Sequence, residues 1–394
     1  MNKLANNKKR MKAENRRQVL HLLQGESLSR AELAKRTRLT QAAISGIVDE
    51  LTAEGIVLEC GKAETKLGRK PIKLQMNPQW GYALGISIDH DGFELGIVDI
   101  TGRVIGETIS MPYHDHPMEA LDSLCQTMTE LVAVHHIDEQ RVIGLGAIAP
   151  GPVDIKSGII LNAPGFDSWH HLNLRLELQK RLPYRVFIQH NANALARAEY
   201  SFGVGKNYKS FALLVINAGI GLGLMLNEQI YSGVNGQGCE IGHTSVDING
   251  RLCPCGNRGC LEAYASTAAV LYDINSYQKH IHTWKDFMDA AAAGDPLCGR
   301  MLGSQAAYLA HSVVNLNNLL GLDAVIITGL ALYRGELLAE LIEQNLSGRL
   351  LSSETGRLTV QLSSLRENAT VIAAGSVVTD QLYMHDLYDL CVNR

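Results

Sequence analysis

Apolar side chains recur at helical spacing near the start of the chain, which predicts two short helices. Between Glu14 and Leu23 they form one face of a first helix, made of Val19, Leu20, Leu22 and Leu23. A capping box follows, because Ser29 can accept a hydrogen bond from the third helical residue while Glu32 reaches back to the backbone of Ser29. We expect this second helix to end near Arg38.

A third helix is predicted from Gln41 to Glu54, because Thr40 is a favourable N-cap and Gly55 favours a helix end. Its inner face consists of Ile44, Ile47, Val48 and Leu51, which lie at helical spacing. The opposite face is small or polar and is able to approach base edges. Its candidate DNA contacts are Thr40, Gln41, Ala42 and Ser45.

Two strand-like runs between Ile56 and Gln75 surround a basic turn and resemble a wing. Two short helices with a tight turn, followed by a wing, predict a winged helix-turn-helix over residues 1–80. We expect Arg69 to enter a minor groove and Lys70 to contact phosphate. Three short helices alone would also suit a protein-interaction module.

From Tyr82 the pattern changes to alternating strands, which form one β-meander before residue 110 and a second one from Phe211 onward. Helical stretches separate the two. This repetition predicts an α/β body with two lobes, actin/hexokinase-like (RNase H-like), and a ligand cleft between them. We assign residues 81–200 to the first lobe and 201–394 to the second, with the last helix packing back on the first lobe.

The composition is that of a soluble globular protein, with 46% hydrophobic and 19% charged residues. No apolar run approaches the ~20 residues that span a bilayer, and the basic N-terminus is not followed by an apolar signal segment. We therefore expect a cytoplasmic protein without membrane insertion. The charge is uneven: the first 80 residues hold 16 Lys and Arg against 8 Asp and Glu, while the remainder holds 20 against 32. A basic head on an acidic body favours DNA as the partner of the head.

One histidine and three cysteines lie within 18 positions, and they are His243, Cys253, Cys255 and Cys260. Together they are a complete tetrahedral ligand set for zinc. A disulfide is the alternative, which a cytoplasmic setting disfavours. Because no ligand position remains for a catalytic water, we expect a structural Zn²⁺ ion.

The glycines of the second meander, Gly219, Gly221 and Gly223, are followed by another strand, so a dinucleotide-binding turn is a poor interpretation. A hairpin whose backbone N–H groups can approach a phosphate fits better.

These motifs resemble those of the ROK family, which contains repressors and sugar kinases. The resemblance rests on Glu240–His243, Cys253–Glu262, Pro150–Asp154 and the Gly219–Gly221 hairpin, and covers about residues 81–394. With the winged head, the whole chain is similar to the family's sugar repressors. The resemblance implies that the residues binding sugar are Asn162, Asn191, Glu240, His243 and Glu262. It also implies two tasks for His243, with one ring nitrogen on zinc and the other toward a sugar hydroxyl.

The chain departs from the family's kinases at the catalytic positions. Kinases carry an Asp general base where this chain has Asn191, and an amide cannot accept the proton. His190 is a possible substitute, but we expect its side chain to leave the strand at a different angle. The first phosphate loop, Asp89–Phe93, lacks its Thr and gains Asp91, and the glycine run near the C-terminus is reduced to Thr328–Leu330. We therefore assign no catalytic residues.

The sequence thus predicts a repressor of sugar uptake or catabolism genes. A homodimer or homotetramer would bind a pseudo-palindromic operator and respond to a sugar or sugar phosphate. Two alternatives stay open: an active hexose kinase with a regulatory head, and a repressor controlled by a transporter protein.

Overall fold

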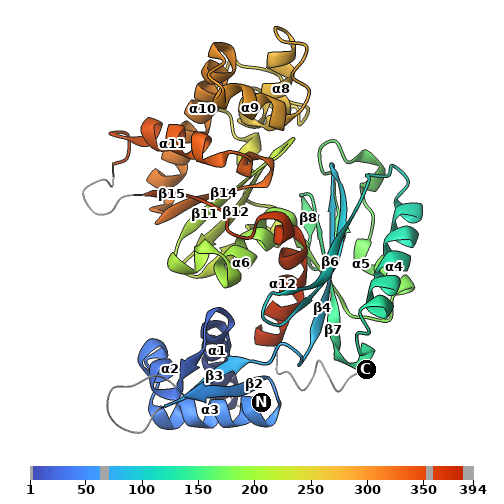
Figure 1. The fold of residues 1–394 in the computed structure, drawn as a ribbon, viewed down its shortest axis with the longest axis vertical. Helices are drawn as coiled ribbons and strands as arrows, with labels where there is room; N and C mark the ends of the chain where they lie inside the picture. Colours follow the sequence, from blue (N-terminus) through green and yellow to red (C-terminus); the bar gives the residue numbers. More distant parts are fainter. Residues whose placement is uncertain (1–2, 63–70, 352–357, 385–394) are drawn as a thin grey trace.

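The N-terminal head combines three helices with a small sheet. The computed structural model describes residues 3–62, 71–351 and 358–384. The helices are α1 (Lys3–Gly25), α2 (Arg30–Thr37) and α3 (Gln41–Ala53), and the strands are β1 (Leu28–Ser29), β2 (Val57–Lys62) and β3 (Ile72–Met76). The strands pair in the order β1-β3-β2. Helices α2 and α3 therefore stand beside an antiparallel β2-β3 ribbon, in the arrangement of a winged helix-turn-helix (Figure 1).

The helix caps predicted from the sequence are confirmed. The backbone N–H of Ser29 donates to the Glu32 carboxylate over 2.7 Å, and the Glu32 N–H donates to the Ser29 hydroxyl, which completes the capping box. The Thr40 hydroxyl accepts from the Ala43 N–H over 3.2 Å at the start of α3. The predicted inner face of α3 is buried in the core of the head, and its members are Ile44, Ile47, Val48 and Leu51.

Helix α1 begins about three turns earlier than the apolar pattern predicts, at Lys3 instead of Glu14. One ion pair contributes to this difference, because Lys12, in the part that was not predicted, reaches Glu50 of α3 over 2.8 Å. Polar residues of high helix propensity extend the helix without an apolar stripe, so hydrophobic periodicity alone could not reveal this part.

The first lobe is a five-stranded sheet covered by helices on both faces. Its strands pair in the order β10-β7-β4-β5-β6. Their bounds are β4 (Tyr82–Asp89), β5 (Gly92–Asp99), β6 (Val104–Met111), β7 (Val142–Ala149) and β10 (Val186–His190). Helices α4 (Pro117–Val134) and α5 (Leu174–Arg181) share one hydrophobic core with this sheet. A short ribbon, β8 (Val153–Asp154) with β9 (Ile159–Ile160), follows β7.

The second lobe repeats this topology. Its strands are β11 (Phe211–Ile216), β12 (Ile220–Leu226), β13 (Gln229–Tyr231), β14 (Ala324–Thr328) and β15 (Thr359–Leu362), in the order β13-β12-β11-β14-β15. In both sheets a three-stranded meander continues through its first strand into two parallel strands. The outer face is covered by α7 (Glu262–Ala265), α8 (Thr267–Asn275), α9 (Trp284–Ala292), α10 (Pro296–Leu320) and α11 (Gly335–Leu346). The predicted two-lobed actin/hexokinase-like α/β fold is thus confirmed.

Two helices fill the space between the sheets, α6 (Asn191–Phe202) and α12 (Ala369–Met384) (Figure 1). Helix α12 packs against β4 and β7, so the last described helix lies on the first lobe. Helix α6 packs on β12 and α12, and the lobe boundary that we predicted at residue 200 falls inside it. Glycines permit these approaches: a Cβ at Gly146 would lie 1.8 Å from the Ala374 carbonyl oxygen, and one at Gly223 would lie 2.1 Å from that of Ala192.

Within the described residues, no helix has both the length and the apolar character needed to cross a bilayer.

Candidate functional site

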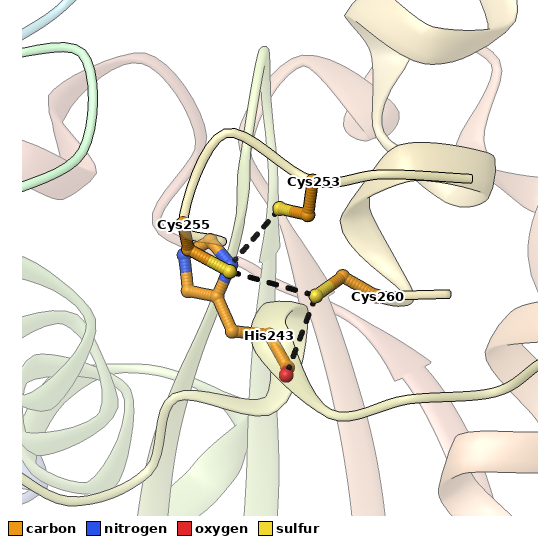
Figure 2. Close-up of side chains that lie close together, drawn as sticks. All are labelled: His243, Cys253, Cys255 and Cys260. Carbon is orange, nitrogen blue, oxygen red and sulfur yellow. Dashed lines mark hydrogen bonds between the residues drawn. The ribbon is translucent and has the colours of Figure 1, made fainter. Parts of the chain in front are cut away.

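The predicted histidine and three cysteines converge at one point of the second lobe (Figure 2). The Cys253 sulfur lies 3.6 Å from His243 Nδ1, and the Cys255 and Cys260 sulfurs are 3.7 Å apart. A tetrahedral ion with metal–sulfur bonds of about 2.3 Å and a metal–nitrogen bond of about 2.1 Å places two sulfurs about 3.8 Å apart, and a sulfur about 3.6 Å from the nitrogen. The four groups therefore fit a tetrahedral metal ion such as zinc.

Tight turns bring these ligands together. His243 ends a short 3-10 helix, η5 (Ile241–His243), and the cysteine loop turns at Gly256 and Gly259, whose φ angles are 91° and 69°. A Cβ at Gly259 would lie 1.7 Å from the Asp247 carbonyl oxygen, so only glycine fits there. Burial and the neighbouring thiols raise the pKa of Cys260 to about 12. A nearby cation would favour the thiolate form of Cys260.

A cavity of about 230 Å³ lies between the lobes, next to this cluster. The structure brings four of the predicted sugar-binding residues to its wall, namely Asn191, Glu240, His243 and Glu262. Asn162 is exposed in the loop after β9 and is not among the residues that line the cavity. Because His243 turns Nδ1 toward the Cys253 sulfur, its Nε2 is the nitrogen left for the cavity.

The two glutamates of this cavity differ in their surroundings. Glu262 begins α7 and accepts from the Ile220 N–H over 2.9 Å. Glu240 Oε1 is buried without a hydrogen-bond partner among the described residues. Burial, and then the charge of Glu262, raise the pKa of Glu240. A ligand hydroxyl that donates to Glu240 Oε1 would satisfy this orphaned acceptor.

His190 also lines the cavity, contrary to our expectation that its side chain would leave the strand in another direction. It ends β10 on the same buried side as Val186 and Ile188, because alternate residues of a strand share a face. A Cβ at Gly151 would lie 2.9 Å from both His190 Nε2 and Glu240 Oε1, so these two groups flank Gly151. Burial lowers the pKa of His190 to about 4, which keeps the imidazole neutral at pH 7.

A larger cavity of about 460 Å³ adjoins the first one. The two share four wall residues, which are Asp89, Asn191, Val215 and Asn217. The Asn191 amide donates to Asp89 Oδ2 over 3.1 Å, and burial raises the pKa of Asp89. Asp91 and Glu94 also line this larger cavity, so three of its wall residues are carboxylates when Asp89 is included.

The predicted DNA-contacting residues lie on the outer side of the head. Thr40, Gln41 and Ala42 are exposed at the start of α3, and Ser45 is half-buried. Arg69 and Lys70 lie outside the described residues.

Sequence reasoning missed the contact between the head and the body. The His21 ring of α1 stacks on the Tyr200 ring of α6, with centroids 4.5 Å apart and planes 7° from parallel. The Arg197 guanidinium lies 5.4 Å from the Tyr200 centroid and pairs with Asp380 of α12 over 2.8 Å. Burial, and then the charge of Arg197, lower the pKa of His21 to about 4. No local pattern marks these residues, because they are far apart along the chain.

The chain is similar to repressors and to sugar kinases. The family model described as "ROK family" matches residues 84–381. The chain is 29% identical to the xylose repressor of Bacillus subtilis over 359 residues, which covers 91% of this chain and 93% of that repressor. It is 28% identical to the glucokinase of Thermotoga maritima over 313 residues, covering 76% of this chain and 98% of the glucokinase.

A solved structure extends the similarity over the head. The crystal structure of a ROK family transcriptional regulator, a homolog of the E. coli MLC protein, superimposes with a TM-score of 0.80 at 25% identity. The match covers 98% of this chain and 100% of that regulator. The glucokinase match covers a smaller share of this chain than either regulator match does.

Proposed function

This chain belongs to the ROK family, and from that premise we propose that it is a DNA-binding transcriptional repressor of sugar uptake or catabolism genes, controlled by a sugar. One observation carries the proposal: a cavity lined by Glu240, His243 and Glu262 occurs in the same chain as a winged helix-turn-helix. The similarity to repressors over more than nine tenths of the chain supports it.

Sugar binding in the smaller cavity would use the two carboxylates and His243. A carboxylate accepts hydrogen bonds from neighbouring hydroxyl groups, which suits a polyol. Glu240 Oε1 has no protein donor to compete with the ligand. His243, Cys253, Cys255 and Cys260 would hold a zinc ion, which supplies structural cross-linking because its four positions are filled by protein. With Nδ1 of His243 held in this way, Nε2 would keep its proton and donate to a hydroxyl.

The proposed function includes no phosphoryl transfer. Asn191 occupies the position of the kinase base, and an amide is not a base at neutral pH. His190 reaches the cavity, but a pKa of about 4 makes it a weak base. An active hexose kinase is the rival, and it predicts ADP formation from ATP and a hexose that is lost in His190→Gln. Absence of turnover with a broad sugar panel removes that rival.

Control of DNA binding would operate through an oligomer, as a homodimer or homotetramer that presents two heads to a pseudo-palindromic operator. Closure of the cleft on sugar would change the spacing of the heads. The sugar must then bind more tightly to the conformation that does not bind DNA. A transporter protein is the alternative effector, and it is favoured if no free sugar releases DNA while a transporter domain does.

The test combines a binding screen with a DNA assay. Duplexes that the purified chain selects from a random library supply the operator. Sugars that raise the melting temperature bind the folded state, and the proposal expects such a sugar to release the selected duplex. A chain that selects no sequence from the library contradicts the repressor function.

Replacing Glu240 by glutamine is expected to weaken sugar binding while operator binding is retained. Losing a hydrogen bond to a charged group costs about 1.5–3 kcal/mol, or roughly 10- to 100-fold in affinity. Isothermal titration with the sugar found in the screen measures the change. Glu340→Gln, on the exposed side of α11, is the control and should bind as the natural chain does. Unchanged affinity in Glu240→Gln would show that the sugar binds elsewhere.

A further inference from the structure

The two joined cavities are strongly acidic. Five carboxylate side chains line them, which are Asp89, Asp91, Glu94, Glu240 and Glu262. Among the described residues of both walls, Arg366 is the single Lys or Arg. Phosphate sites in proteins normally rely on Arg or Lys, on free backbone N–H groups, or on both.

Four backbone N–H groups in or beside the cavity walls are already bonded to the chain's own side chains. At the end of β4, the His90 N–H donates to the Asp89 carboxylate over 2.7 Å. At the start of α6, the Ala192 N–H donates to the Asn191 side-chain oxygen over 2.7 Å. The N-terminus of a helix is otherwise a ready anion site, and here its own side chain takes one of the first N–H groups.

In the glycine hairpin and in the loop after β14, backbone N–H groups are likewise bonded to the chain's own side chains. The Ile220 N–H donates to Glu262 over 2.9 Å, and the Leu330 N–H donates to the Asn217 side-chain oxygen over 2.7 Å. A Cβ at Gly219 would lie 2.7 Å from Glu262 Oε2, so the glycine makes room for that carboxylate. In the hairpin that we expected to approach a phosphate, the Ile220 N–H is therefore already bonded to a glutamate.

A phosphate dianion in this cleft would lose its hydration with Arg366 as the one Lys or Arg among the described wall residues, and it would face several carboxylates of like charge. The neutral imidazole of His190 adds no cation to the wall. A neutral sugar fits this cleft better, because it carries no like charge and its hydroxyl groups can donate hydrogen bonds to the carboxylates.

We propose that the cleft selects a neutral, unphosphorylated sugar and rejects sugar phosphates and nucleotides, with Asp91 and Glu94 as the residues that exclude phosphate. This inference rests on the proposed function, namely that the body senses a sugar. It narrows the effector from any sugar or sugar phosphate to the uncharged class.

The test compares each free sugar with its own phosphate ester on the full chain. Suitable pairs are glucose and glucose 6-phosphate, N-acetylglucosamine and N-acetylglucosamine 6-phosphate, and mannose and mannose 6-phosphate, with xylose and Mg-ATP as further probes. Isothermal titration is expected to find a free sugar that binds at least about 100-fold more tightly than its ester, since like-charge juxtaposition costs several kcal/mol. Mg-ATP should not bind at millimolar concentration.

The outcomes separate the inference from the proposed function. An ester that binds as tightly as its parent sugar, or micromolar binding of Mg-ATP, overturns the inference and leaves sugar sensing intact. A chain that binds its selected operator but none of these probes contradicts sugar sensing itself, and the inference fails with it.

A double variant tests the two excluding residues directly. Asp91→Asn with Glu94→Gln removes both charges while keeping similar size, and the Gln oxygen can still accept from the Thr370 hydroxyl. The ratio between ester and free-sugar affinity should narrow by about tenfold or more. Glu340→Gln is the matched control and should keep the ratio of the natural chain. An unchanged ratio in the double variant would assign the selectivity to other residues and overturn the role of Asp91 and Glu94.

Discussion

Replacing Cys260 with serine is expected to release the metal ion from the second lobe and to lower stability by more than about 4 kcal/mol, as loss of a structural metal does. The Cys260 side chain is fully buried, and its sulfur lies 3.7 Å from that of Cys255. A serine hydroxyl is a far poorer ligand than a thiolate for a soft tetrahedral ion. Without the ion, the three remaining ligand groups have no common partner.

The consequences should reach the sugar cavity, because His243 is shared by both sites and Glu262 follows Cys260 by two residues. Zinc content measured by mass spectrometry should fall from one ion per chain to none in Cys260→Ser, and thermal unfolding should shift downward. A strong chelator should reproduce both effects on the natural chain.

Cys239→Ser is the matched control. Cys239 lies outside the cluster, and its sulfur donates to the Tyr231 carbonyl oxygen over 3.2 Å, a bond that a serine hydroxyl can replace. This variant should keep its metal and its melting temperature. If Cys260→Ser also kept both, the four residues would not be a structural metal site.

Replacing Tyr200 with leucine is expected to uncouple DNA binding from sugar binding. Helix α6 begins with Asn191 in the cleft and carries Tyr200 near its other end, stacked on His21 of the head. Its 12 residues form a rigid rod of about 18 Å. Movement of the cleft would therefore reach α1 through this contact.

In Tyr200→Leu, sugar should still raise the melting temperature, whereas operator affinity should change by less than about twofold on adding sugar. Couplings of 1–3 kcal/mol correspond to roughly 5- to 150-fold changes in the natural chain. Tyr272→Leu on α8, where the side chain is 77% exposed, is the control and should respond normally. His21→Phe should retain the response, because an aromatic ring can keep the stack. A full sugar response in Tyr200→Leu would exclude this route of communication.

The parts that the sequence predicted well depend on residues close together in the chain. The capping box at Ser29 and the N-cap at Thr40 join groups three residues apart, so composition and spacing suffice. The metal cluster spans 18 positions, and its two glycine turns are local as well. The two-lobed body could be inferred from its repeated meander because strand periodicity is a property of each short segment.

Other features depend on segments that only the folded chain brings together. The Asn217 side-chain oxygen accepts a hydrogen bond from the Leu330 N–H, which is 113 positions away in the chain. The stack of His21 on Tyr200 joins the head to the body. Whether the His190 side chain points into the cavity likewise depends on which face of β10 is buried in the folded protein.

The amino-acid sequence therefore predicts a basic winged head, a two-lobed kinase-like body and a candidate metal ligand set, and it places the amide of Asn191 where the family resemblance implies a catalytic base. Each of these is encoded in short-range spacing or in residue identity. The tertiary structure alone decided that Glu262 occupies the hairpin's backbone donor, that five carboxylates line the joined cavities, and that α6 connects the cleft to the head. The net charge of a cleft and the contacts between distant helices depend on residues from many separate segments of the chain. These segments come together only when the chain folds, so neither property can be derived from local sequence.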